Sequence, residues 1–282
     1  GIETPGNSEP RTGLSMGEHM AITAKKWGIS REAQDELALA SHKNLAAAYD
    51  AGFLDDLVTG YRGLARDTVA LVDGLWRDLN GTAPDGMTVL DVGGGPGYFA
   101  TEFSSAGMTY IGVEPDPREM HAGPAAQPDG AGSFVRASGM ALPFADGSVD
   151  VCLSSNVAEH VREPWLMGRE MLRVTRPGGL VVLSYTVWLG PFGGHEMGLT
   201  HYLGGRRAAE MYTRKHGHRP KNDYGSSLFA VSAAAGLEWA RSTGALVAAF
   251  PRYHPQWAWR ATSVPVLQEF LTSNLVLVLR PS

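Results

Sequence analysis

Cysteine is almost absent from this chain of 282 residues, which contains only Cys152. A single cysteine excludes an internal disulfide and fits a reducing compartment, so we expect a cytoplasmic protein. No apolar run approaches the ~20 residues that a membrane helix needs, and the amino terminus is polar. We therefore expect no membrane span and no signal peptide. A hydrophobic content of 44% with 19% charged residues is typical of a soluble globular enzyme.

An excess of basic residues is also lacking. The 24 Lys and Arg residues stand against 29 Asp and Glu residues, which gives a net charge of -5. Such a balance argues against a large phosphate-binding surface, so we expect no nucleic-acid partner. The sequence carries no signal for the oligomeric state.

The chain reads as two unequal parts. Helical patterns run over residues 18–27, 30–51 and 61–79, and the segment NGTAPDG at residues 80–86 forms a turn-rich break. Beyond it, short apolar runs alternate with helical stretches. Strands are predicted over residues 88–92, 110–114, 133–136, 149–154, 180–186, 246–250 and 274–280, with helices over 98–106, 165–174 and 264–271. This alternation predicts an open α/β sheet that binds its ligand at the carboxyl ends of the strands.

A glycine-rich turn follows the first strand, in the segment DVGGGPG at residues 91–97. Glycines allow the backbone to approach a ligand and tolerate positive φ. A dinucleotide site needs G-x-G-x-x-G, but Tyr98 occupies the position of the third glycine. Asp91 before the turn suits a cationic amine better than a pyrophosphate. A tight strand-to-helix link without a ligand is the alternative.

Glu114 closes the second predicted strand, in IGVEPD at residues 111–116. A carboxylate at this position can accept hydrogen bonds from both hydroxyls of a ribose. A ribose site without a phosphate site indicates a nucleoside, and an amino-acid tail on that nucleoside would explain Asp91. S-adenosylmethionine has both features, so we expect it as the cofactor.

Four segments carry a family resemblance. DVGGGPG at residues 91–97 resembles the first motif of class I methyltransferases, and MALPFADGSVD at 140–150 is similar to a run of the type 11 subfamily. NVAEH at 156–160 and RPGG at 176–179 match two further segments, in the same order. The resemblance covers residues 61–282. It implies a Rossmann-like seven-stranded sheet with helices on both faces, preceded by a helical amino-terminal segment.

The resemblance also implies a cofactor site. The residues expected to contact S-adenosylmethionine are Asp91, Gly93, Gly94, Gly95, Gly97, Glu114, Pro115, Ser138, Gly139, Met140 and Asn156. Type 11 enzymes usually have Asp in place of Ser138, so the contact to the adenine amino group is expected to be weaker or to come from the backbone. Asn156 is expected to face the methyl group, whereas Glu159 and His160 are expected to be structural.

Residues 187–228 form a polar, His-rich insert between the fifth and sixth predicted strands, and we expect it to cover a small-molecule or lipid-like acceptor. The candidate bases are His195, Glu196, Tyr185 and His201. The alternative is that each caps a loop or faces solvent. The spacing of His195, Glu196 and His201 matches no established metal motif, so no metal is expected. The segment RYHPQWAWR at 252–260 is a second candidate lining, or else shelters a sheet edge.

Residues 12–59 resemble a different family. SMG at residues 15–17, GISRE at 28–32 and GFLDD at 52–56 are similar to parts of a thiolase loop domain. A thiolase needs a nucleophilic Cys and a second Cys as base, and Cys152 belongs to the other part of the chain. We therefore expect residues 1–59 to be a non-functional fragment joined near Thr59 to Tyr61, and residues 60–282 to be the methyltransferase domain. The alternatives are a cofactor-binding but catalytically impaired chimera and, remotely, a thiolase-type acyltransferase.

Overall fold

The computed structural model describes residues 25–26, 30, 32, 53–121, 131–254, 259, 262 and 264–282. The chain divides into two compact units, Gly1–Gly60 and Tyr61–Ser282. The helices predicted over residues 18–27 and 30–51 lie almost wholly outside the described residues, as do the thiolase-like motifs SMG and GISRE, whereas most of the motif GFLDD lies in the first described helix. Most of the described residues therefore belong to the second unit.

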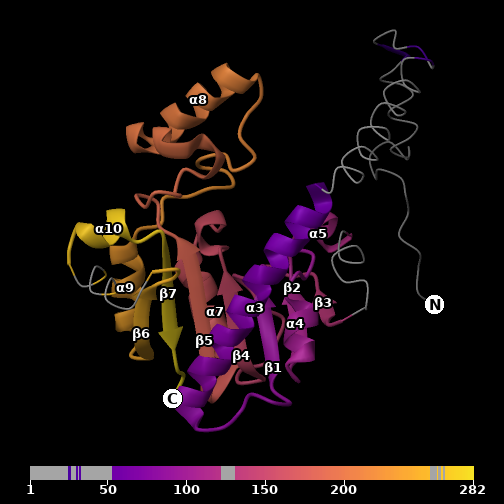
Figure 1. The fold of residues 1–282 in the computed structure, drawn as a ribbon, viewed down its shortest axis with the longest axis vertical. Coiled ribbons are helices and arrows are strands. Elements are labelled where there is room, and N and C mark those ends of the chain that lie inside the picture. Colours follow the sequence, from indigo (N-terminus) through magenta and orange to yellow (C-terminus); the bar gives the residue numbers. More distant parts are fainter. Residues whose placement is uncertain are drawn as a thin grey trace. The chain divides into compact units, whose positions relative to one another are not determined.

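The second unit alternates strands and helices along the chain (Figure 1). The strands are β1 (Thr88–Val92), β2 (Thr109–Val113), β3 (Ser133–Val135), β4 (Val149–Ser155), β5 (Thr175–Thr186), β6 (Leu246–Pro251) and β7 (Asn274–Leu279). The α-helices are α3 (Phe53–Asn80), α4 (Ala100–Ser105), α5 (Pro117–His121), α7 (Pro164–Val174), α8 (Gly205–His216), α9 (Ala233–Ser242) and α10 (Leu267–Leu271). Two 3₁₀ helices are η1 (Ala158–His160) and η2 (His195–Leu203).

The strands form one seven-stranded sheet in the order β3-β2-β1-β4-β5-β7-β6. Neighbours from β3 to β5 are parallel, whereas β7 runs antiparallel to both β5 and β6. The strand order reverses between β1 and β4, and a crevice for a ligand opens at such a point, outside the carboxyl ends of the strands. The predicted α/β sheet with seven strands is confirmed.

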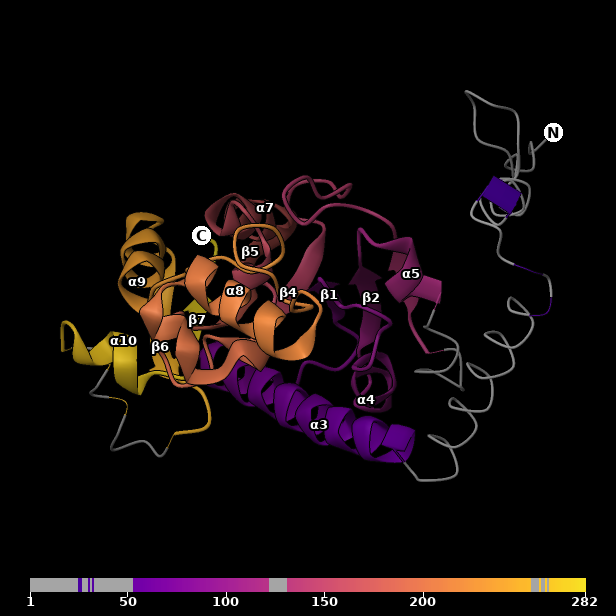
Figure 2. The ribbon, with the colours of Figure 1, turned by 90° about the horizontal axis from the view of Figure 1, so that it is seen from above.

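Alternating side chains divide the core into two layers. Leu90 and Val92 of β1 pack in one apolar cluster with Met167 and Met171 of α7. Val89 packs on the opposite face, in a second cluster that contains Val72 of α3. Successive residues of a strand point to opposite faces, so each buried strand supplies both layers. Figure 2 shows α7 and α9 on one side of the sheet and α3 and α4 on the other.

Helices α5 and α8 were not predicted, and α3, β5 and α9 also differ from the prediction. Helix α3 begins at Phe53 and continues past Gly60, so the expected junction lies inside a helix. Strand β5 begins at Thr175, because Thr175 already pairs with Val149 of β4 and the RPGG segment lies in the register shift before Leu180 pairs with Val151. Helix α9 was not predicted, although the Ser232 hydroxyl caps it by accepting a hydrogen bond from the Ala235 amide at 3.1 Å.

The insert has a small core of its own. Met197, Ala208, Ala209 and Leu228 are buried together, with Trp188 and Tyr212 packed against them. Figure 1 shows α8 beyond the carboxyl ends of the parallel strands. The insert therefore stands on the side of the sheet where a ligand is expected. In the part of the chain that the structure describes, no helix has the length and apolar character to cross a membrane.

Candidate functional site

The turn after β1 requires glycine at Gly93. Its φ is +79°, and a Cβ there would lie 2.5 Å from a methyl carbon of Val157. The Gly93 amide donates to the Val113 carbonyl at 2.8 Å, which ties the turn to the end of β2. Gly95 also has a positive φ, of +54°, but no atom lies within 4 Å of the position that its Cβ would take. The backbone at Gly95 is therefore open to a ligand.

Asp91 is buried in the strand before this turn. The Tyr110 hydroxyl donates a hydrogen bond to its Oδ2 at 2.7 Å. Burial raises the pKa of Asp91 to about 7, although the hydrogen bond from Tyr110 acts in the opposite direction. The carboxyl group is thus poised to ionise fully when a cation arrives beside it.

Glu114 follows the last residue of β2 and faces the same turn. Its carboxylate accepts hydrogen bonds from the Gly95 amide at 3.3 Å and from the Asp116 amide at 2.9 Å. Burial raises the pKa of Glu114, and these two hydrogen bonds oppose the rise. The carboxylate is therefore held at the edge of the turn, in position to accept from hydroxyl groups.

Two cavities meet at the turn. One of about 330 Å³ is bounded by Asp91, Gly93, Gly94 and Gly95 together with Tyr61 and Tyr98, whose rings stack. The other, of about 700 Å³, has among its walls the predicted contacts Gly93, Glu114, Pro115, Ser138, Gly139 and Met140. The Ser138 hydroxyl accepts a hydrogen bond from the Met140 amide at 3.2 Å, which shapes that loop. Gly97, with a φ of +84°, lies between the turn and α4.

Asn156 connects these cavities to a further one. It follows β4 with a φ of +57°, and its Oδ1 accepts a hydrogen bond from Asn274 Nδ2 at 2.6 Å. Asn156 borders both cavities at the turn and a cavity of about 450 Å³. The walls of that cavity are Asn156, Thr186, Pro191, Phe192, Tyr253, His254, Ser273 and Asn274. A ligand at the turn and a second ligand in this cavity would meet at Asn156.

Comparisons with known proteins agree with this geometry. Residues 90–183 match the family described as a methyltransferase domain. A protein of Mycolicibacterium gilvum, described as an uncharacterised methyltransferase, is 76% identical over 222 residues, which cover 79% of this chain and 87% of that protein. The chain belongs to this methyltransferase family.

A second relative of the methyltransferase, from Mycobacterium leprae, is 75% identical over 78% of this chain and 82% of its own length. An S-adenosylmethionine dependent methyltransferase from Mesorhizobium loti shares the fold, with 19% identity, a TM-score of 0.51, and coverage of 73% of this chain and 96% of that one. Residues 5–72 also match the family described as the thiolase amino-terminal domain. That match extends over residues 53–72 of α3, of which residues 61–72 belong to the second unit.

Arg252 connects three elements of the methyltransferase beside the 450 Å³ cavity, and this role was not predicted. This side chain is only 4% exposed. Its guanidinium donates to Asp67 at 2.6 Å, to Thr68 at 2.8 Å and to Ser155 at 3.2 Å. Arg252 therefore connects α3 to the end of β4. The next two residues, Tyr253 and His254, line the 450 Å³ cavity.

The four predicted bases fall in different places. Tyr185 is fully buried and donates to the Ser232 carbonyl at 2.9 Å, and His201 is buried with Nδ1 at 2.8 Å from the Gly198 carbonyl. Glu196 accepts two hydrogen bonds from Asn222 and borders a separate cavity beside α8. Among the four, His195 lies nearest the site, since its ring is 5.1 Å from that of His160, which lines the 700 Å³ cavity. Burial and the neighbouring His160 lower the pKa of His195.

Proposed function

We propose that this protein transfers a methyl group from S-adenosylmethionine to a small, largely apolar acceptor. The cofactor supplies a methyl group on a sulfonium leaving group, so the protein mainly has to position the acceptor and exclude water. The single observation that carries the proposal is the position of Asn156, which borders both the cavities at the glycine turn and the 450 Å³ cavity.

The residues around the turn fit this cofactor. Glu114 would accept hydrogen bonds from the ribose hydroxyls, and the open backbone at Gly95 leaves room for the nucleoside. Asp91 would balance the ammonium group of the methionine tail, which restores the ionised form that burial disfavours. Ser138 and the backbone up to Met140 would contact the adenine.

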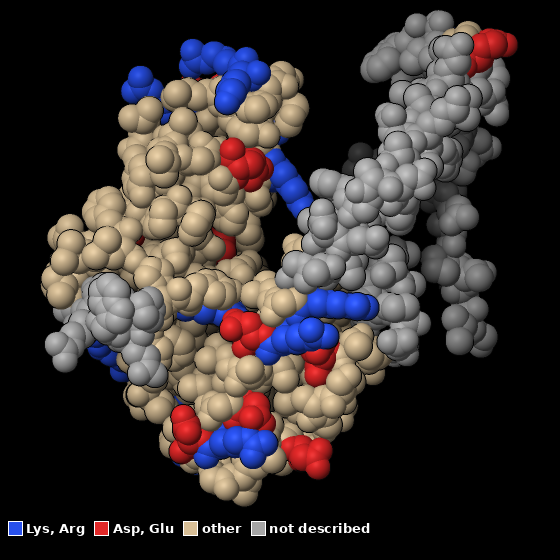
Figure 3. Space-filling model, in the orientation of Figure 1, with Lys and Arg blue, Asp and Glu red and all other residues tan. Residues whose placement is uncertain are grey.

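The walls of the 450 Å³ cavity support an apolar or lipid-like acceptor. Phe192 and Tyr253 line it and are 69% and 61% exposed. Exposed apolar side chains continue on the insert and α10, at Leu199, Leu203, Val266, Leu267, Phe270 and Leu271. In Figure 3 the surface over α10 carries few charged side chains, while basic groups gather at the outer end of α8. Thr186, His254, Ser273 and Asn274 supply the polar groups that would orient an acceptor atom.

Residues 1–59 have no chemical role in this proposal. The lone cysteine, Cys152, is buried in β4, and burial raises the pKa of its thiol far above the ordinary value. Such a thiol is not a nucleophile, so an acyltransferase activity of the thiolase type is not proposed.

Calorimetric titration with S-adenosylmethionine and S-adenosylhomocysteine tests the cofactor assignment. The wild-type chain is expected to bind both, and the double variant Asp91→Ala, Glu114→Ala is expected to lose binding. Asp73→Ala is the control, because Asp73 pairs with Arg77 on the exposed side of α3. No binding by the folded wild-type chain, or equal binding by the double variant, would refute the proposal.

A further inference from the structure

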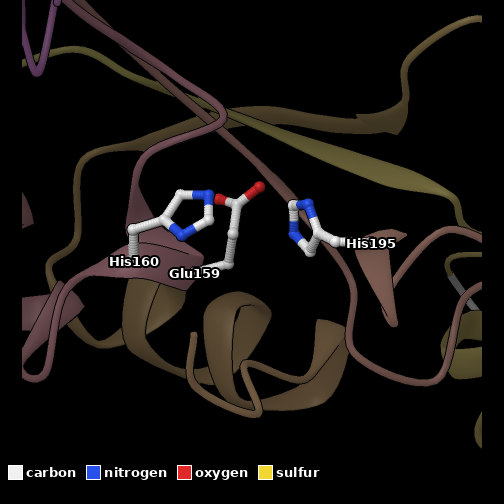
Figure 4. A group of neighbouring side chains, drawn as sticks. All are labelled: Glu159, His160 and His195. Atoms are coloured by element: carbon white, nitrogen blue, oxygen red, sulfur yellow. The ribbon is translucent and has the colours of Figure 1, made fainter. Parts of the chain in front are cut away.

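Glu159, His160 and His195 come together beside the 700 Å³ cavity, although His195 is 35 residues from His160 in the sequence. Glu159 and His160 belong to η1, which follows β4, and His195 begins η2 in the insert. One potential ligand atom from each residue lies within 4.8 Å of the other two. Figure 4 shows the Glu159 carboxylate between the two imidazole rings.

Two of the three side chains are held by their other polar atoms. His160 Nδ1 lies 2.7 Å from the Ser227 carbonyl, which can only accept, so Nδ1 carries the proton and the lone pair is on Nε2. Glu159 Oε1 accepts a hydrogen bond from the Thr186 amide at 3.1 Å. A backbone partner on the second nitrogen is typical of a metal-binding histidine, because it sets the tautomer and the ring orientation.

Two polar atoms of this cluster have no hydrogen-bond partner in the part of the chain that the structure describes. Within the described residues, Glu159 Oε2 and His195 Nε2 are buried and make no hydrogen bond. Glu159 is only 1% exposed, so solvent does not satisfy its carboxylate. Leaving such atoms unpaired is costly, and a cation between them would satisfy both at once.

We infer that Glu159, His160 and His195 form a binding site for a divalent transition-metal ion. Two imidazole nitrogens and one carboxylate suit Zn²⁺, Fe²⁺ or Mn²⁺ better than Mg²⁺ or Ca²⁺, which prefer oxygen ligands. Three protein ligands leave at least one coordination position open, as in catalytic zinc sites. Bond lengths of about 2.1 Å require the three side chains to close slightly around the ion.

At this position the ion would have a role in activating the acceptor. His160 lines the cavity that also contains Glu114 and Asn156, so an ion held by His160 would lie near the proposed cofactor site. A hydroxyl group bound to such an ion loses its proton far more readily than one in water. An acceptor oxygen bound there would need no free base, and His195 would serve as a ligand. The metal site itself does not depend on the proposed methyl transfer.

Metal titration of the intact chain, freed of any affinity tag and of bound metal, tests the site. Zn²⁺ binding is followed by competition with a chromophoric chelator, and Co²⁺ binding by its visible spectrum. We expect one tight site per chain, which Glu159→Gln and His195→Asn each weaken by at least about 100-fold. Gln keeps the acceptor for the Thr186 amide, and Asn tolerates the left-handed conformation of His195, whose φ is +47°.

Two controls separate this site from adventitious binding. The double variant His216→Gln, His218→Gln removes two neighbouring exposed histidines, and His201→Gln removes a buried histidine outside the cluster. Both controls are expected to bind as the wild type does. Weak or absent binding by the wild type, or wild-type affinity in Glu159→Gln and His195→Asn, would overturn the inference.

A proton NMR spectrum of the wild-type chain tests the same site without any substitution, so a variant that fails to fold does not affect the result. With Co²⁺ bound, the His160 Nδ1 proton is expected as a paramagnetically shifted signal that disappears in D₂O. Absence of any shifted imidazole signal would count against the site in the same way.

Discussion

The glycine turn and the insert both line the 700 Å³ cavity but are built differently. Residues 91–97 form a continuous segment, and their geometry follows from local residue types: an apolar strand, an acid and glycines with positive φ. The insert, in contrast, contacts residues that are distant in the sequence, such as His160 of η1, whose ring centroid lies 5.1 Å from that of His195. A site built from one segment can therefore be predicted from sequence, whereas a site built by folding becomes visible only in the structure.

The largest loss of stability is expected from substitution of Gly93, where the turn is most crowded. Gly93→Ala places a methyl group against Val157 at a φ of +79°, so strain and overpacking together should destabilise the fold by about 2–5 kcal/mol. Gly95→Ala meets no neighbour, and the cost of its left-handed backbone alone should be about 1–2 kcal/mol. Urea unfolding measures both. Equal losses would mean that Val157 does not constrain the turn.

Asp91→Asn should separate stability from cofactor binding. The folded pKa of Asp91, about 7, lies above the ordinary value of 3.8, so its ionisation destabilises the fold as the pH rises from about 4 to 7. Asn keeps an oxygen for Tyr110 and does not ionise. Relative to wild type, the variant should therefore gain about 2–3 kcal/mol of unfolding free energy between pH 5 and pH 8.

The same substitution should abolish measurable affinity for S-adenosylmethionine. Wild-type affinity should itself fall as the pH drops below 7, by up to about tenfold per pH unit, because the carboxylate form binds the ammonium group. Calorimetry over the same pH range checks both statements. A variant that binds normally would place the ammonium group away from Asp91.

Arg252 tests the part of the site that depends on long-range contacts. Arg252→Met removes a buried guanidinium that joins α3 to β4, and should cost about 1–3 kcal/mol, since Asp67 stays partly solvated. Arg77→Met breaks an exposed pair on α3 and should cost no more than about 1 kcal/mol. Thermal and urea unfolding compare the two. A similar small loss in both variants would show that the Arg252 contacts contribute little.

Much of the fold could be predicted, because periodicity and glycine turns report local structure. β1 was predicted to the residue, and the other strands to within a residue or two at each end, apart from the start of β5. Helix α9 was not predicted although Ser232 is a recognisable cap, because the helix closely follows a polar insert whose composition is typical of loops. Arg252 was missed for a different reason: an isolated arginine in an aromatic segment is usually exposed, and only the fold shows its three partners.

The candidate site likewise has a part that the sequence indicated and a part that it did not. Asp91, Glu114 and Asn156 line two cavities that meet at Gly93, and their role in binding a cofactor stays a prediction. The spacing of His195, Glu196 and His201 indicated no metal motif, and the structure separates these three. It groups His195 instead with Glu159 and His160, which were expected to be structural. His195 and Gly198 have positive φ values, and these turns in the backbone bring His195 to Glu159 and His160. No periodic sequence pattern indicates such turns.

The smallest effect is expected from removing the amino-terminal unit. Residues 61–282 contain both apolar layers of the sheet and all the cavities described for the site. Deletion of residues 1–52 leaves α3 to begin at Phe53 and should change the unfolding free energy by less than about 1 kcal/mol. Affinity for S-adenosylmethionine should stay at the full-chain value. A gain in affinity would favour the impaired chimera, in which the thiolase-like segment hinders a sound site, whereas a loss would give that segment a part in cofactor binding.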